Sequence, residues 1–554
     1  MKSILNYFFA FASILLLAVS CQQEGNEIDK KTVQLAQKLI DFNFTDQEID
    51  SMLPYLAYAR DDYKKLREIG ISNPITPRLY FDPRPQGFLL EGAQGVNKWE
   101  IPADVEMPVN IDDLAFYTVA ELSSLLKHGK VTSTQLTQLY INRLKKYGDT
   151  LQCLVTLTEE RAFKQAAMAD EEMAKGIYHG PLHGIPFGVK DLFAVEGYKT
   201  TWGAMPYKDQ QIGQTATVVK KLEDAGAILV AKLTLGALAM GDVWFGGVTK
   251  NPWDLNQGSS GSSAGSASAT AAGLVAFAIG TETWGSIVSP STRCGVTGLR
   301  PTYGRVSRSG AMALSWSMDK VGPICRNAQD CAIVFDVIRG YDVNDPSTTN
   351  YPFNYNNSVK ITDLKIGYLK GLFEGDDYRS KANDLKTLEE FKKMGARLQE
   401  VKLPDDLPVG SMAIILEAEA AAAFDELTRS NKDDELVEQH QNAWPNIFRK
   451  SRFIPAVEYI QASRMRDLLI EELNKIIMNY DVIICPSFGG DQLLMTNLTG
   501  HPCVVVPNGF DNENHPTSIS FIGNLYDEAT ILHVADQYQQ VTRFYSIKPE
   551  KFIK

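Results

Sequence analysis

The sequence predicts an α/β fold with a largely parallel β-sheet that helices cover on both faces. Four short apolar runs, at residues 184–189, 227–231, 482–485 and 503–507, have the length and composition of buried strands. Helical stretches separate these runs, and this alternation is typical of parallel strands joined by crossover helices. The 554 residues, 44% hydrophobic and 22% charged, can bury a large core.

The first twenty residues have the composition of an export signal. Met1 and Lys2 give the chain a positively charged N-terminal region. The apolar run at residues 4–19 is shorter than a typical membrane-spanning helix. Residues 17–21, LAVSC, resemble the lipobox of bacterial lipoproteins, although Ala18 stands where leucine is usual. This resemblance implies that Cys21 becomes the lipidated first residue of a cell-envelope lipoprotein, anchored to a membrane. The alternative is a plain secretory signal with an incidental cysteine, which also predicts export.

A tether and a helical extension are expected next. Residues 21–31 are mostly polar, and we expect them to form the lipid-anchored tether. The capping box Thr45-x-x-Glu48 then leads into an apolar helical segment. Because the stretch 72–88 is interrupted by prolines, it reads as an irregular connector. We therefore expect residues 32–110 to form a helical N-terminal extension of the main domain, packing over it and limiting substrate access or serving as a spacer.

The main domain is expected to occupy residues 111–554. It opens with two helices that begin at capping boxes, Thr118-x-x-Glu121 and Thr132-x-x-Gln135. Residues 375–478 are rich in helix-favouring residues and are expected to contribute to a substrate pocket.

Charge and cysteine usage restrict the partners. The formal net charge is −12, and no run of Lys or Arg could neutralise a phosphate backbone, which argues against nucleic acid. The six cysteines after Cys21 show no CxxC pair and no Cys/His metal spacing, and HExxH is absent, so no metal is implied. We interpret them as buried hydrophobes, with a Cys325–Cys331 disulfide left open.

A serine-rich stretch at residues 258–269, GSSGSSAGSASA, has the composition of a flexible linker. It runs directly into an apolar, helix-like segment at 269–280 and then into a second Gly/Ser turn, so its serines are attached to the core. One interpretation is a tight turn that caps a buried helix. The other is that some of these hydroxyls take part in chemistry.

Lys190 ends the apolar run that predicts a buried strand, beside Asp191. A buried lysine either pairs with an anion or loses its proton. Holding it neutral at pH 7 displaces its equilibrium by about 4.6 kcal/mol. Residues 190 and 191 therefore form part of a structural ion-pair network, or Lys190 is a neutral base.

Three segments together resemble the amidase signature family, hydrolases of amide bonds with a Ser-Ser-Lys triad. They are GIPFGVKD at 184–191, SGSSAGS at 260–266 and GTETWGSIVSPSTRCGVTGLRPT at 280–302. Ser262 and Ser286 are 24 residues apart, as the family's two catalytic serines are. The resemblance extends from about residue 112 to the C-terminus. It implies the amidase-signature fold, with a large, twisted, mostly parallel mixed sheet flanked by helices.

The resemblance implies a role for each matched residue. Ser286 would be the nucleophile, Ser262 a bridging serine on a cis peptide bond, and Lys190 the terminal base of a relay that forms an acyl-enzyme. This assignment is chemically sound because a serine hydroxyl is a weak nucleophile until a base takes its proton. The oxyanion hole would consist of four backbone N–H groups. These belong to Thr283, Trp284, Gly285 and Ser286. No cofactor is implied.

Trp284 departs from the family pattern, which usually has glycine at this position. If the backbone N–H keeps its role, the indole narrows or shapes the acyl pocket. The alternative is that the indole packs away into the core.

The sequence therefore predicts an envelope amidase that hydrolyses a small-molecule carboxamide or acyl-amide. One alternative is the glutaminase-type subunit of glutamyl-tRNA amidotransferase, which residues 246–255 and 302–310 resemble, although that function requires the cytoplasm. The alternative from another class is a catalytically silent binding lipoprotein of the envelope.

Overall fold

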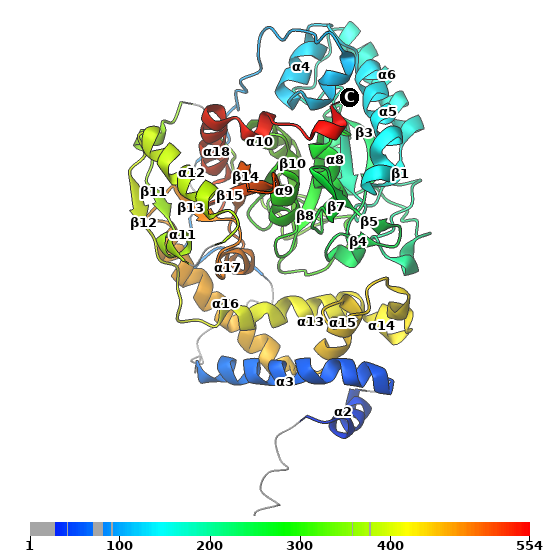
Figure 1. Ribbon diagram of the computed structural model, residues 1–554, viewed down its shortest axis with the longest axis vertical. Coiled ribbons are helices and arrows are strands. Elements are labelled where there is room, and N and C mark those ends of the chain that lie inside the picture. The colour runs from blue at the N-terminus through cyan, green and yellow to red at the C-terminus, as the bar shows by residue number, and fades with distance from the viewer. Residues whose placement is uncertain are drawn as a thin grey trace, which may run out of the picture.

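The computed structural model describes residues 28–40, 42–69, 81–89, 92–356, 358–375 and 378–553. The signal segment, Cys21 and most of the tether lie outside these residues, so the expectations for them remain predictions. An 11-stranded sheet forms the centre of the molecule (Figure 1). In spatial order its strands are β1 (Leu154–Leu157), β3 (Ile228–Leu233), β2 (Pro186–Lys190), β8 (Phe277–Glu282), β10 (Lys320–Cys325), β9 (Thr297–Arg300), β14 (Cys503–Phe510), β15 (Pro516–Gly523), β13 (Val482–Pro486), β11 (Ile366–Tyr368) and β12 (Leu398–Glu400).

The predicted α/β fold with a mixed sheet is confirmed, but the expectation that parallel pairs predominate is wrong. In this sheet, parallel pairing is confined to β3–β2–β8 and to β13–β11–β12. The other neighbouring strands, from β8 through β10, β9, β14 and β15 to β13, pair antiparallel, as does β1 with β3. A strand buried on both faces reads as a continuous apolar run whatever its direction, so composition does not reveal the direction.

The four apolar runs correspond to β2, β3, β13 and β14, and the first three of these strands are buried along their whole length. The apolar segment 269–280 is not one helix, as its pattern suggested. Helix α8 (Ala264–Ala271) ends there, Gly273 takes a φ of +69°, and β8 begins at Phe277. Because a short apolar run is compatible with either period, only the left-handed glycine marks the break.

Helices flank the sheet, and the capping boxes mark where three of the helices begin. Thr45, Thr118 and Thr132 each accept a backbone N–H at the starts of α3 (Asp46–Glu68), α4 (Val119–Lys127) and α5 (Ser133–Leu151). Other flanking helices are α6 (Glu159–Ala174), α7 (Thr217–Asp224), α9 (Val288–Cys294), α10 (Ala328–Ile338), α12 (Lys381–Lys393), α17 (Gln492–Thr499) and α18 (Glu528–Thr542).

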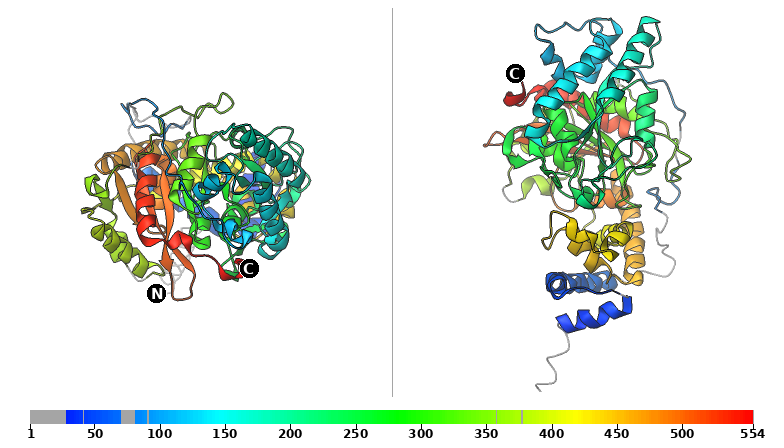
Figure 2. Two further views of the ribbon diagram at one scale, coloured as in Figure 1. Left: turned by 90° about the horizontal axis from the view of Figure 1, so that it is seen from above. Right: turned by 90° about the vertical axis from the view of Figure 1, so that its right-hand side faces the viewer.

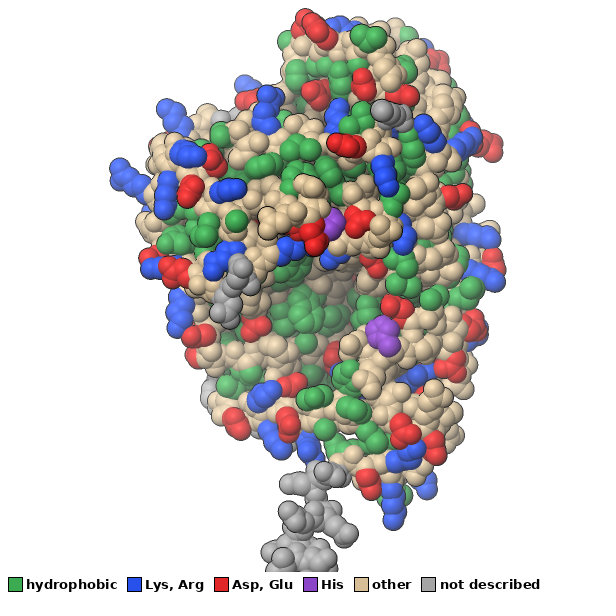
Figure 3. Space-filling model, in the orientation of Figure 1, with side chains coloured by type: hydrophobic (Ala, Val, Ile, Leu, Met, Phe, Trp, Pro, Cys, Tyr) green, Lys and Arg blue, Asp and Glu red, His purple; other side chains and the backbone are tan. Residues whose placement is uncertain are grey.

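A separate group of helices, here called the helical layer, lies below the sheet in Figure 1. It comprises η6 (Val409–Ala413), α13 (Ile414–Ala423), α14 (Asp425–Arg429), α15 (Trp444–Ser451) and α16 (Ala456–Ile477). Both side views show α3 lying across the outer side of this layer, with α2 (Lys30–Ala36) beyond it (Figures 1 and 2). The face seen in Figure 3 is hollowed between the sheet and the helical layer, and hydrophobic side chains line the hollow.

Helix α3 is docked on the helical layer by an ionic cluster and a hydrogen bond. The Nη2 atom of Arg449 lies 3.0 Å from Glu48 Oε1 on α3 and 2.7 Å from carboxylate oxygens of Asp433 and Asp434. The Tyr55 hydroxyl on α3 donates to a side-chain oxygen of the segment before α15 at 2.7 Å. The α2–α3 part of the N-terminal extension therefore packs on the helical layer on the side away from the sheet.

The described cysteines are all free and buried, which excludes the Cys325–Cys331 disulfide that the sequence left open. Among the described residues, no helix combines the length and the apolar composition needed to cross a membrane.

Replacing Arg449 with methionine should destabilise the protein by about 3 kcal/mol, because the buried Asp433 would lose its counter-charge. Thermal unfolding should show the loss. The matched control is Arg429→Met, which removes an exposed ion pair with Asp425 and should change stability by less than about 0.5 kcal/mol. Equal effects of the two variants would contradict the role given to Arg449.

Candidate active site

The serine-rich stretch is part of the buried core, so it is not a linker. Every residue of α8 is buried, and its Ser266 hydroxyl donates to the Ile279 carbonyl of β8 at 3.1 Å. Just before the helix, the Ser263 hydroxyl donates to the Thr281 carbonyl and accepts the Thr281 N–H. These hydroxyls join α8 to β8, which explains why a serine-rich segment can be buried without unpaired polar groups.

Lys190 lies at the end of β2 with its ammonium group among hydroxyls. Its Nζ is 2.8 Å from Ser262 Oγ, 2.8 Å from Thr281 Oγ1 and 3.2 Å from Ser263 Oγ. The side chain is fully buried, and burial lowers the pKa of Lys190 to about 7, although the more distant carboxylates of Asp319 and Glu282 oppose the shift. A substantial fraction of Lys190 is therefore neutral at physiological pH.

The alternative in which Lys190 and Asp191 belong to one ion-pair network does not hold. Asp191 instead pairs with Lys232 of β3, whose Nζ lies 2.7 Å from Asp191 Oδ1, and both side chains are completely buried. The other carboxylate oxygen of Asp191 accepts the N–H and the hydroxyl of Thr201. The carboxylate next to Lys190 in sequence is thus used elsewhere.

The two serine motifs meet beside Lys190. The Gly261–Ser262 peptide bond is cis, as the resemblance implied, and the Ser263 N–H donates to the Ser286 carbonyl at 3.1 Å. In the part of the chain that the structure describes, no hydrogen bond joins the hydroxyls of Ser262 and Ser286. Catalytic hydrogen bonds are often formed only when substrate is present, so this geometry is compatible with a relay through Ser262.

The turn at residues 283–286 presents unused backbone donors. Among the described residues, none accepts a hydrogen bond from the N–H groups of Thr283, Trp284, Gly285 and Ser286. Gly285 has a φ of +87°, a conformation that side chains disfavour, whereas Trp284 has no positive φ. This is why a tryptophan can replace a glycine at position 284 but not at position 285.

Glu282 holds the residues that follow this turn in place. No sequence motif indicated this role. Its carboxylate accepts the N–H groups of Ile287 and Val288 at 2.8 and 2.9 Å and pairs with Arg300 at 2.8 Å. Burial alone would raise the pKa of Glu282, but Arg300 and the hydrogen bonds lower it to about 2. The one signal in the sequence is an acidic residue that ends a buried apolar strand.

The side chain of Trp284 is 46% exposed. The alternative in which the indole packs into the core is therefore wrong. The indole is partly exposed on the turn that carries Ser286.

One cavity lies next to this centre, and a second cavity adjoins the first. The inner cavity, of about 180 Å³, is lined by Thr281, Thr283, Asp319 and most of residues 308–316, among others. The outer cavity, of about 700 Å³, lies between the sheet and the helical layer. Asp319 accepts the Thr283 hydroxyl at 2.6 Å, so the same carboxylate lines the inner cavity and holds the donor turn.

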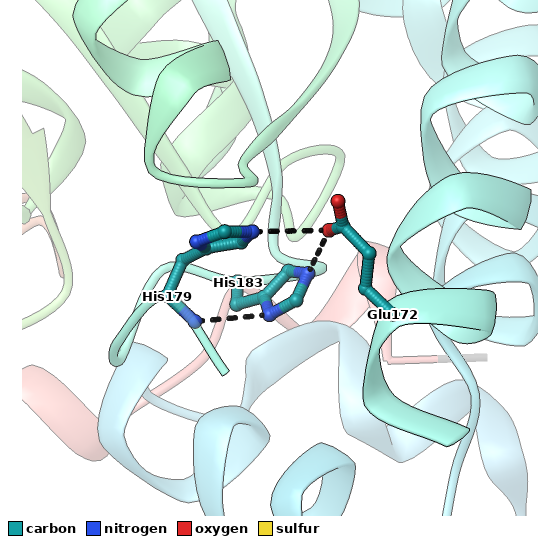
Figure 4. Close-up of side chains that lie close together, drawn as sticks. All are labelled: Glu172, His179 and His183. Atoms are coloured by element: carbon teal, nitrogen blue, oxygen red, sulfur yellow. Dashed lines mark hydrogen bonds and ion pairs between the residues drawn. The ribbon is translucent and has the colours of Figure 1, made fainter. Parts of the chain in front are cut away.

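A second cluster of titratable groups lies before β2 (Figure 4). Nε2 atoms of His179 and His183 lie 3.2 and 3.1 Å from the same oxygen of Glu172. Nδ1 of His183 accepts the backbone N–H of His179 at 3.3 Å, so the ring proton of neutral His183 is on Nε2 and is donated to Glu172. That nitrogen then has no lone pair for a metal ion, and the cluster ties the loop to α6.

Comparison with known proteins shows what the chain resembles. Residues 135–495 match the family described as Amidase. A glutamyl-tRNA(Gln) amidotransferase subunit of Marinomonas sp. (strain MWYL1) is 33% identical over 479 residues, which cover 78% of this chain and 98% of that protein. The native peptide amidase of Stenotrophomonas maltophilia is 28% identical with a TM-score of 0.70, covering 78% of this chain and 98% of that one. A bacterial aryl acylamidase of the amidase signature family shares the fold, with a TM-score of 0.69 at 20% identity.

Replacing Lys190 with methionine should stabilise the folded protein at pH 7. The native state binds fewer protons than the unfolded state between the native pKa of about 7 and the ordinary value of 10.5, so wild-type stability should rise with pH across this window. Removing that penalty contributes at most about 4 kcal/mol at pH 7, less the hydrogen bonds lost. Thermal unfolding at pH 7, 8.5 and 10 should show a higher Tm at pH 7 and a smaller rise with pH.

The control for this prediction is Lys232→Met, which removes a second buried lysine. It should destabilise the protein, because Asp191 is left buried and unpaired. A destabilised Lys190→Met protein with the wild-type pH dependence would show that Lys190 is charged in the native state.

Proposed function

Because the chain belongs to the amidase signature family, we propose that it hydrolyses the C–N bond of a carboxamide or acyl-amide, giving an acid and ammonia or an amine. The observation that carries this proposal is the contact of the buried Lys190, with its lowered pKa, with the Ser262 hydroxyl. A neutral amine in that place is a base of suitable strength near pH 7. The proposed reaction needs no cofactor.

Each proposed step moves one proton along the same relay. Neutral Lys190 accepts the proton of the Ser262 hydroxyl as Ser262 accepts that of Ser286, and the Ser286 oxygen bonds to the amide carbon. When the tetrahedral intermediate collapses, the relay runs backwards, protonates the leaving nitrogen and releases it. Water then attacks the acyl-enzyme with the same groups acting as base and acid, which releases the acid and restores Ser286.

The free N–H groups of residues 283–286 are the proposed oxyanion donors. Such donors contribute roughly 3 to 4 kcal/mol each in transition-state stabilisation where they have been measured. Their value depends on being held in place before the reaction, and the contacts of Glu282 to Ile287 and Val288 supply that support.

A second candidate is the glutaminase activity of an amidotransferase subunit, which the 33% identity to such a subunit supports. That function requires a cytoplasmic protein and partner subunits. The signal-like residues 1–20 and the LAVSC sequence favour an exported lipoprotein instead, so we propose a lipid anchor at Cys21 and a place in the cell envelope.

Ser286→Ala should abolish both turnover and covalent labelling by a fluorophosphonate probe, with a loss of about a thousandfold or more. In the active protein, kcat/KM for a primary amide should rise with pH and level off above an apparent pKa of about 7, because only neutral Lys190 accepts a proton. Peptide mapping of the adduct and a pH-rate profile are the measurements.

Ser268→Ala is the control for Ser286→Ala. It removes another buried serine hydroxyl, which bonds to the Lys250 carbonyl away from Lys190, and should keep labelling and turnover. Labelling that persists in Ser286→Ala would exclude Ser286 as the labelled nucleophile, whereas a folded wild-type protein that takes no label and turns over no amide would favour a silent binding protein.

Cys21→Ala should abolish incorporation of a labelled fatty acid and release the protein from the membrane fraction, because the acylated thiol is the proposed anchor. Mass spectrometry of the mature N-terminus is the direct measurement. A mature protein that is cytoplasmic, unprocessed and bound to partner subunits would instead support the amidotransferase candidate.

A further inference from the structure

The outer cavity is large and adjoins the inner cavity. Its volume of about 700 Å³ lies within the range of pockets that enclose drug-sized ligands. The two cavities share Arg308, Trp316 and Asp345 in their walls. The two cavities therefore adjoin at these three residues, and the inner cavity reaches Thr281 and Thr283 beside the donor turn.

The charged groups around the outer cavity are already satisfied by the protein. Arg308 pairs with Asp345 and donates to the Ser347 hydroxyl at 2.9 Å. The Glu419 carboxylate accepts four hydrogen bonds, from the Ser315 hydroxyl, the N–H and hydroxyl of Ser317, and the Tyr459 hydroxyl. The surface that these walls offer to a ligand is therefore mainly apolar. A charged ligand would lose its hydration without gaining a free hydrogen-bonding or ionic partner.

That carbon surface is held rigidly. The Phe81 ring lies 4.3 Å from the guanidinium of Arg466 and packs edge-on against Tyr303, with the ring centroids 4.7 Å apart. Arg308 covers the Tyr303 ring at 4.9 Å. An aromatic wall fixed before binding costs little entropy when a ligand arrives. Phe81 comes from the segment that precedes the catalytic domain in sequence, so this chain builds the wall partly from its N-terminal extension.

We propose that the outer cavity is a substrate subsite for a bulky apolar group, an alkyl chain or an aryl ring, attached to the scissile amide. The inference rests on the proposed amide hydrolysis and narrows its substrate class. The carbonyl carbon lies at Ser286, the atoms next to it fill the inner cavity, and the apolar group passes Trp316 into the outer cavity. Trp316, half-exposed at the junction, is a specificity-determining residue because its indole borders both cavities.

Two matched substrate series test the proposal: primary amides with acyl chains of two to ten carbons, and acetamides with N-alkyl groups of the same lengths. In the wild-type protein, kcat/KM should rise by about fourfold for each methylene that enters the cavity, in one of the two series. The series that responds shows whether the acyl group or the leaving amine occupies the subsite.

The variant Ala422→Trp tests whether the alkyl chain of the substrate lies in the outer cavity. Ala422 is an exposed alanine on α13 that lines the outer cavity, so an indole there fills part of it without disturbing the core. The ratio of kcat/KM for the ten-carbon substrate to that for the two-carbon substrate should fall about tenfold or more. The matched control is Val457→Trp on α16, next to a lining residue but 64% exposed and outside the cavity wall, which should leave the ratio unchanged.

A binding measurement that needs no turnover separates the subsite proposal from the proposed amide hydrolysis. Ser286→Ala protein should bind decanamide with one site by calorimetry, and Ala422→Trp in that background should weaken the affinity about tenfold. The subsite proposal would be overturned if kcat/KM did not depend on chain length in either series, or if Ala422→Trp did not change the ratio of kcat/KM for the ten-carbon and two-carbon substrates. Either result would leave the proposed amide hydrolysis intact. If wild-type protein hydrolyses no amide and Ser286 takes no fluorophosphonate, the proposed function itself fails, whatever the cavity binds.

Discussion

The active site is organised around a desolvated amine, that of Lys190. Lys190 and Lys232 lie on the adjacent strands β2 and β3, equally buried, yet only Lys232 has a carboxylate in contact. Lys190 is surrounded by the hydroxyls of Ser262, Ser263 and Thr281, which can hydrogen-bond to an amine without stabilising its charge as an anion would. With such partners, burial lowers the pKa of Lys190 to about 7, and the core of the domain must offset the free-energy cost of burying this side chain.

The surrounding carboxylates are arranged so that they do not reverse this effect. Glu282 and Asp319 both favour the charged form of Lys190 through space. Glu282 is paired with Arg300, whose positive charge offsets its field, and Asp319 is engaged by the Thr283 hydroxyl and by two backbone N–H groups. The same contacts hold the donor turn at residues 283–286. Electrostatics and geometry at the site therefore depend on the same few side chains.

Local signals in the sequence predicted helix starts and buried strands, whereas the assignment of Lys190, Ser262 and Ser286 to one site came from the resemblance of three motifs to the amidase signature family. The direction of the strands was not predictable, because a strand buried on both faces has the same composition in either direction. The ion-pair partner of Asp191 is Lys232, and the position of Asp191 next to Lys190 in the sequence did not predict this pairing. Successive side chains along a strand point to opposite faces, so a residue after Lys190 is poorly placed to pair with it, whereas Lys232 on β3 is near in space. The role of Glu282 depends on contacts with Arg300 and with backbone beyond the turn, which no local pattern shows.

The helical layer connects the N-terminal extension to the cavities. Arg449 on α15 holds Glu48 of α3 on the outer side of the layer, and Ser451, two residues further along, lines the outer cavity. On α13, Glu419 and Ala422 face the same cavity. Of the described parts of the extension, α3 lies away from the cavity, whereas Phe81 forms part of its wall. We propose that the extension acts on the site by holding the layer and the aromatic wall in position, so that any effect on substrate range is exerted through the shape of the outer cavity.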